Sequence, residues 1–160
     1  MSRRMSCSMT VDAVLAQTKP VTRRHVDTWK TLKPGDQLTL IEKGMGLRKG
    51  EKQVILAEVV IVDVRVEPIR LMTSDIAYGL REVVLEGLPH MTPEEFVAFW
   101  LRSHGYRDGL NAGGTPLPIN CRRIEWRYLI ETPKCAACGA SYSLPIGMTC
   151  GNHRPEMVWV

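Results

Sequence analysis

The sequence predicts a small, mostly β fold with some α structure, in which a barrel-like sheet carries covering helices. A chain of 160 residues has the length of one domain with a small appendage. Residues 53–69 form a run rich in Val and Ile that is too long for one flat strand, so we expect a strand that bends or wraps. The predicted order is a helix, several strands, two helices and a final strand, which suits a β-barrel with helices over its openings.

The N-terminal half of the chain alternates short predicted elements with turns. Thr10 precedes apolar residues at helical spacing, so it predicts a capped helix over residues 11–17. An extended segment is expected next, over residues 18–24, and a tight turn over 33–36. A strand over 37–43 and a Gly-rich basic loop over 44–52 should follow. Pro68 is expected to end the long strand.

The C-terminal half contains the clearest helix signal. Ser74 is expected to cap a first helix. For a second helix, Thr92 is the expected cap, Pro93 takes the first helical position and Glu95 lies three residues after the cap. Gly105 is expected to end this helix. Residues 121–130 then predict a strand. Its expected inward face carries Ile124, Trp126 and Tyr128.

Composition and charge indicate which kinds of binding partner, nucleic acid or membrane, the protein can have. The net charge of +4 and the pI of about 8.9 permit a nucleic-acid partner without requiring one. The sequence contains no apolar run of about 18 to 20 residues, the length that spans a bilayer, and its N-terminus lacks the apolar region of a secretory signal. We therefore expect a cytoplasmic protein with no membrane partner.

A basic segment near the N-terminus is the first candidate site. The residues TKPVTRR include Lys19, Thr22, Arg23 and Arg24. A hydroxyl beside a desolvated amine can attack an amide, and guanidinium groups can hold a phosphate or an oxyanion. A solvated basic edge strand is the plain structural alternative, because charged side chains usually stay exposed.

Several motifs, taken in order along the chain, resemble the ASCH family over roughly residues 5–130. The motifs are TKPVTRR, then LKPGD with a following strand, then EGL and MTPEEFVAFW, and finally RRIEWRYL. The resemblance implies a PUA-like β-barrel with a polar cleft that binds nucleic acid. Some small members are amidohydrolases that remove the acyl group of N4-acetylcytidine, using a Lys-x-x-Thr pair and a downstream Glu. The matching positions here are Lys19, Thr22 and Glu86.

The C-terminal tail carries a metal-type pattern outside this resemblance. Two short-spaced pairs of ligands, separated by eleven residues, are formed by Cys135, Cys138, Cys150 and His153. Such pairs supply the four ligands of tetrahedral zinc, so we expect a closed, structural zinc site. Unpaired thiols or a redox pair of the first two cysteines are the alternatives. The expected domains are an ASCH/PUA-like domain over 1–131 and a zinc-knuckle-like tail over 132–160.

Three functions remain open at the level of sequence. The first is a module that binds RNA or a modified nucleotide in a basic cleft. Its expected nucleic-acid contacts are Arg23, Arg24, Trp29, Lys43, Arg48 and Lys49. The second is an amidohydrolase acting on an N4-acylated cytidine-type nucleoside, with Lys19, Thr22 and Glu86 as catalytic residues. The third is an adaptor whose zinc tail binds a protein partner.

Other side chains are expected to have plain structural roles. Cys7 and Cys121 are expected to be small buried residues. Three aromatic residues at helical spacing are expected to form core rather than a base-stacking platform, namely Phe96, Phe99 and Trp100. Three histidines are expected to lie on the surface without partners, namely His25, His90 and His104.

Overall fold

The computed structural model describes residues 3–106 and 119–129, which form a five-stranded sheet and four helices. The strands are β1 (Arg3–Ser6), β2 (Val21–His25), β3 (Gln37–Ile41), β4 (Ile55–Pro68) and β5 (Asn120–Tyr128). The helices are α1 (Val11–Leu15), α2 (Leu71–Ser74), α3 (Ile76–Leu85) and α4 (Pro93–Ser103). The spatial strand order is β1-β3-β4-β5-β2. All pairings are antiparallel except that of β1 with β3.

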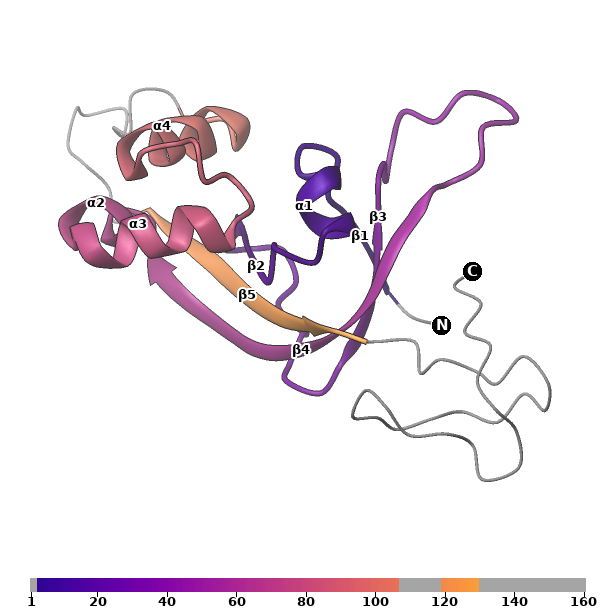
Figure 1. Cartoon of the computed structure of the whole chain (residues 1–160), viewed down its shortest axis with the longest axis horizontal. Helices are drawn as coiled ribbons and strands as arrows, with labels where there is room; N and C mark the ends of the chain where they lie inside the picture. The colour runs from indigo at the N-terminus through magenta and orange to yellow at the C-terminus, as the bar shows by residue number, and fades with distance from the viewer. Residues whose placement is uncertain (1–2, 107–118, 130–160) are drawn as a thin grey trace, which may run out of the picture. The chain divides into compact units, whose positions relative to one another are not determined.

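Strand β4 gives the sheet its curvature. It runs for 14 residues and ends at Pro68, as the sequence predicts. Its pairing with β5 shifts register between Ile61 and Asp63, and such irregularities bend a strand. Figure 1 shows β4 sweeping through a long arc with β5 beside it. The result is a curled half-barrel, because β1 and β2 remain as its two edges.

The short strand β1 is absent from the sequence prediction. It has only four residues, and its parallel register sets Arg3 opposite Leu38 and Ser6 opposite Ile41. The backbone N–H of Cys7 continues this alignment by donating to the carbonyl oxygen of Ile41. Four residues show too little periodicity to reveal a strand, and the partner lies more than thirty positions away.

The predicted helix caps agree with the structure for α4 but not for α3. Thr92 and Glu95 form the reciprocal capping box expected for α4. The expected cap at Ser74 was wrong, because Ser74 ends the short α2 and the side chain of Asp75 caps α3 instead. Thr10 precedes α1 but makes no side-chain capping bond.

Two hydrophobic clusters lie in different parts of the described chain. The first is built around Leu38, Val59 and Trp126, from β3, β4 and β5. The second joins α2, α3 and α4 to the start of β5, around Met72, Phe96 and other residues that include Cys121. In Figure 1, α2, α3 and α4 gather at one end of the sheet, and α1 lies nearer to β1 and β3. Strand β2 contacts two of these helices, because the Arg23 side chain donates to Glu82 of α3 and the Arg23 backbone oxygen accepts from Trp100 of α4.

Candidate functional site

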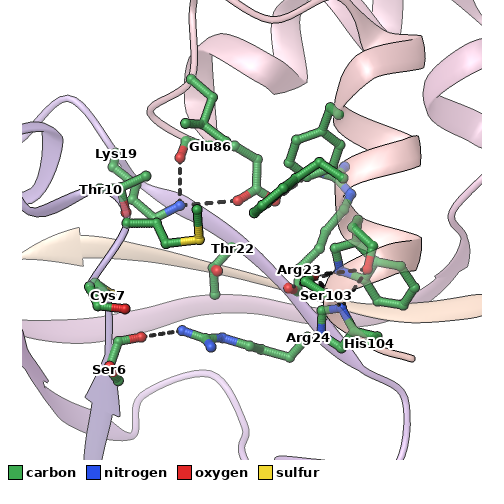
Figure 2. A pocket seen from close by; sticks show the side chains of 16 residues that line it. Ser6, Cys7, Thr10, Lys19, Thr22, Arg23, Arg24, Glu86, Ser103 and His104 are labelled. Carbon is green, nitrogen blue, oxygen red and sulfur yellow. Dashed lines mark hydrogen bonds and ion pairs between the residues drawn. The ribbon is translucent and has the colours of Figure 1, made fainter. Parts of the chain in front are cut away.

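A pocket of about 260 Å³ contains the basic segment identified in the sequence. It is bounded by the segment after β1, by the residues leading into and along β2, by the chain that follows α3, and by α4 (Figure 2). Its lining residues with polar side chains are Ser6, Ser8, Thr10, Lys19, Thr22, Arg23, Arg24, Glu86, Ser103 and His104. The structure therefore brings the candidate amine, hydroxyl and acid to one cavity.

Lys19 and Glu86 form a buried ion pair in this pocket. The Lys19 ammonium donates to the backbone oxygen of Glu86 at 2.6 Å and to its Oε2 at 3.0 Å. Each residue is only 3% exposed. Glu86 follows the last turn of α3, and Gly87 then turns the chain with a φ of 77°. At this left-handed position glycine also lets the backbone pass close to Ala13 and Lys19.

Arg23 extends the ion pair into a buried network. Its guanidinium donates to Glu86 Oε1 at 3.1 Å, to Glu67 Oε1 at 2.8 Å and to Glu82 Oε2 at 2.6 Å. It also donates to the Tyr78 hydroxyl at 2.9 Å. The planar guanidinium offers several donors at once, which lets one residue join α3 and β4 to β2.

The balance of burial and charge fixes the ionisation of this network. Burial alone would lower the pKa of Arg23, but the charges of Glu86 and Glu67 outweigh burial and raise it. For Glu82, burial alone would raise the pKa. Hydrogen bonds from Arg123 and Arg23, together with their charges, outweigh burial and hold the pKa of Glu82 below its ordinary value. These groups therefore stay charged at neutral pH.

Thr22 and Arg24 lie two residues apart on β2, so their side chains leave the same face of the strand. Thr22 is 5% exposed and lines the pocket. One terminal nitrogen of Arg24 donates to the backbone oxygen of Ser6 in β1. The Nε of Arg24 is buried and has no hydrogen-bond partner among residues 3–106 and 119–129.

Helix α4 gives the pocket an aromatic side that the sequence analysis missed. Phe96 and Trp100 are 2% exposed and belong to the core, as expected. Phe99 and His104 are only half-buried, and both line the cavity. The expectation that Phe99 is core, and that His104 is a surface residue without partners, was therefore wrong. The helical spacing shows that these rings belong to one helix, but it does not show which of them faces a cavity.

The remaining two histidines differ in their surroundings. His25 is half-buried, and its Nε2 lies 3.1 Å from the Tyr106 hydroxyl, so the expectation of no partner was wrong for it as well. His90 is exposed, as expected. Cys7 and Cys121 are both buried free thiols, also as expected.

The other predicted nucleic-acid contacts do not line the pocket. Trp29 is half-buried against the first core cluster, and the guanidinium of Arg3 lies 5.8 Å from the centre of its ring. Lys43, Arg48 and Lys49 are exposed in the segment between β3 and β4. The Lys43 ammonium lies 3.7 Å from a carboxylate oxygen of Glu51.

The predicted zinc ligands lie outside the described residues, as does the rest of the tail. These ligands are Cys135, Cys138, Cys150 and His153. Within residues 3–106 and 119–129, no group of three or more His, Cys, Asp or Glu side chains is arranged to hold a metal ion. In the same described part of the chain, no helix has both the length and the apolar character needed to cross a bilayer.

Comparisons with known proteins agree with the fold. No family model matches the sequence, and no curated protein matches it. The crystal structure of protein EF3133 from Enterococcus faecalis V583, described with the family name DUF984, aligns with a TM-score of 0.50 and 14% identity over 81% of this chain and 80% of that one. The hypothetical protein PH0355 aligns with a TM-score of 0.47 and 19% identity, over 81% of this chain and all of the other. The similarity to the first structure is one of fold alone.

Proposed function

We propose that this chain is an ASCH-type protein that binds RNA or a modified nucleotide, and that the pocket holds one nucleotide unit. The observation that carries this proposal is the buried Lys19–Glu86 pair on the wall of a cavity of about 260 Å³. Buried charges are costly unless they are paired, and a cavity lined by convergent polar groups is the usual form of a small-ligand site. The similarity in fold to protein EF3133 also supports the proposal that this is an ASCH-type protein.

The polar groups suit the edge of a nucleobase. Glu86 can accept a hydrogen bond from an exocyclic amine such as that of cytosine, and the hydroxyl of Thr22 can donate or accept. Arg24 carries a positive charge at the same cavity and suits a phosphate. The charges of Lys19 and Arg23 are already matched by carboxylates, so the pocket favours a nucleotide over an isolated phosphate.

The exposed basic residues between β3 and β4 fit a longer ligand. Lys43, Arg48 and Lys49 can contact the backbone of an RNA whose one nucleotide occupies the pocket. Phosphate contacts of this kind position a strand without reading its sequence. We therefore assign base recognition to the pocket and backbone binding to this basic segment.

Titration calorimetry on the full chain tests the proposal, with cytidine, N4-acetylcytidine, cytidine monophosphate and a short single-stranded RNA as probes. We expect at least one probe to bind, and Glu86→Gln to weaken it at least about tenfold, because the variant removes a charged acceptor. Glu94→Gln, at an exposed position of α4, is the matched control and should bind as the wild type does. Equal affinity of the two variants, with both folded by circular dichroism, would refute the pocket as the binding site.

The arrangement of Lys19, Thr22 and Glu86 favours a second candidate, hydrolysis of an amide on a cytidine-type nucleoside. In this reaction Lys19 first passes a proton to the Glu86 carboxylate, 3.0 Å away, and the neutral amine then takes the proton of the Thr22 hydroxyl as the hydroxyl oxygen attacks the acyl carbon. The C–N bond then breaks, and the leaving exocyclic amine takes the proton back from Lys19. Water cleaves the acyl-threonine ester and releases the carboxylic acid, while Glu86 holds Lys19 in place.

Release of acetate from N4-acetylcytidine distinguishes catalysis from binding alone. If the chain is an amidohydrolase, Thr22→Val should abolish acetate release, whereas cytidine should still bind with an affinity lowered by no more than about tenfold, the loss expected for one hydrogen bond. Absence of acetate from the wild type, under conditions in which N4-acetylcytidine binds, would rule out the hydrolase and leave the binding function intact.

A further inference from the structure

We propose that Phe99 and His104 of the α4 region form an aromatic wall that packs against the planar ring of the ligand and makes the pocket selective for heterocyclic bases. This inference rests on the proposed nucleotide-binding function, and it adds the side of the pocket that reads the base. Figure 2 shows the two sides, with Cys7, Thr10 and Lys19 on one and Ser103 and His104 on the other.

The two sides of the pocket differ in chemistry. The side near β2 and the end of α3 presents the Lys19–Glu86 pair, whose oxygen and nitrogen atoms suit the polar edge of a base. The α4 side presents the rings of Phe99 and His104, with Leu88 also among the lining residues. A nucleobase has both a polar edge and an apolar face, so one planar ring can satisfy both sides at the same time.

The aromatic wall is held by a buried ring behind it. The Trp100 indole stacks on the imidazole of His104, with ring centres 4.0 Å apart and planes inclined by 22°. The indole N–H of Trp100 donates to the backbone oxygen of Arg23 at 3.2 Å, which fixes the ring relative to β2. Trp100 lines the cavity as well, but at 2% exposure it acts mainly as a support for the two more exposed rings. A wall fixed in this way loses little conformational entropy when a ligand binds.

His104 is kept as a neutral ring. Its Nδ1 lies 2.8 Å from the carbonyl oxygen of Trp100, a distance at which Nδ1 carries the hydrogen and donates it. Burial lowers the pKa of His104, the hydrogen bond to the Trp100 carbonyl opposes this, and the neighbouring His25 and Arg24 lower it further, so the net shift is downward. A neutral imidazole presents an uncharged aromatic surface, which suits the face of a base better than it suits a phosphate.

The experiment compares ring-removing and ring-keeping variants of the full chain, with cytidine as the probe. Phe99→Leu and His104→Leu keep apolar bulk and remove the aromatic ring, so each should weaken cytidine binding by about 5- to 150-fold, the range expected for stacking on one base. The single variant Phe99→Tyr should bind cytidine with an affinity within about threefold of the wild type, because tyrosine keeps the aromatic ring. His90→Leu, at an exposed position outside the pocket lining, is the matched control and should leave the affinity unchanged.

A spectroscopic measurement separates stacking from a purely structural effect. In saturation-transfer NMR on the wild type, the base protons H5 and H6 of cytidine should receive more saturation than the ribose protons, and His104→Leu should remove that difference. Cytidine affinity that is unchanged in both leucine variants would overturn the aromatic wall but leave the proposed function standing, provided that Glu86→Gln still weakens binding. Failure of the wild type to bind any nucleoside, nucleotide or RNA probe would overturn both.

Discussion

The ammonium of Lys19 donates to two oxygens of a single residue, the backbone carbonyl of Glu86 at 2.6 Å and its carboxylate at 3.0 Å. This contact ties the chain before β2 to the end of α3, across 67 positions of sequence. It also fixes a carboxylate at the wall of the pocket. The stability of the fold and the geometry of the candidate site therefore depend on the same pair.

The stabilities conferred by Lys19 and Glu86 should depend on each other. Removing one partner should destabilise the fold strongly, and removing the second partner as well should add less than its separate effect. Lys19→Met leaves the Glu86 carboxylate buried with Arg23 as its remaining cation, and we expect a loss of about 3 kcal/mol in the free energy of unfolding. The double variant Lys19→Met/Glu86→Leu should lose less than the sum of the two single variants. Urea denaturation of the four proteins gives the coupling energy.

An exposed ion pair supplies the control for this cycle. Lys30 and Asp27 lie 2.8 Å apart, but their side chains are 61% and 65% exposed. Removing Lys30 should therefore change stability far less than removing Lys19. Additive effects of Lys19→Met and Glu86→Leu would contradict the interaction described above.

The free energy of unfolding should depend on pH through the protonation of the Glu82 carboxylate. Arg123 and Arg23 hold the pKa of Glu82 below its ordinary value of 4.5 in the folded state, so its contribution to stability is complete above about that pH. The contribution disappears as the pH falls through the lower, folded pKa, because the unfolded chain then binds a proton more readily. Glu82→Gln should be less stable than the wild type at pH 7, and the difference should shrink as the pH falls below about 4.5. A constant difference over that range, in chemical denaturation curves, would contradict this assignment.

Gly87 should be sensitive to the addition of one methyl group. A Cβ at this position would lie 2.7 Å from the Cβ of Ala13 and 3.2 Å from the Cβ of Lys19, and the residue has a φ of 77°. Gly87→Ala should therefore destabilise the fold and weaken ligand binding by displacing Lys19. Gly105→Ala is the control, because Gly105 has a φ of 79° but no atom of the described residues would lie within 4 Å of its added Cβ.

Both glycine variants carry the backbone cost of a left-handed residue, about 1 to 2 kcal/mol. Only Gly87→Ala adds steric contacts beside the pocket. Thermal unfolding and cytidine titration of both variants provide the comparison. Equal losses of stability, with unchanged affinity in each, would show that Lys19 is not displaced.

The metal prediction concerns the tail of the full chain. From its ligand spacing we expect one zinc ion per chain, measured by elemental analysis of protein purified without added chelator. Cys135→Ser and Cys150→Ser should each reduce the zinc content, because each removes one thiolate ligand. Cys7→Ala should leave it unchanged, and zinc-free wild-type protein that also fails to bind added zinc would contradict the prediction.

Features with strong local signals were predictable from the sequence. The capping box of Thr92 and Glu95 is a contact between residues three positions apart, so the start of α4 was placed correctly. The long apolar run that became β4 could be recognised as a bent strand because its length exceeds that of an ordinary strand. Lys19 belongs to a basic segment that stands out by itself, whereas Glu86 could be singled out only through family resemblance, since it has no local signal of its own.

Features that depend on long-range contacts were not predictable in this way. The network around Arg23 draws its carboxylates from β4 and from α3 or its end, more than forty positions along the chain. The exposure of Phe99 to the pocket depends on which face of α4 meets the sheet, and helical spacing does not give that orientation. Strand β1 depends on its pairing with β3, because four residues do not specify a strand alone.

The bond from Arg24 to the backbone oxygen of Ser6 joins the two outer strands of the half-barrel, β2 and β1. Among the described strands, no ladder of peptide hydrogen bonds links these two. The two edge strands are therefore joined next to the pocket by a side-chain hydrogen bond, whereas separating paired strands requires several bonds to break together. Loss of this one bond would therefore leave every ladder of paired strands intact.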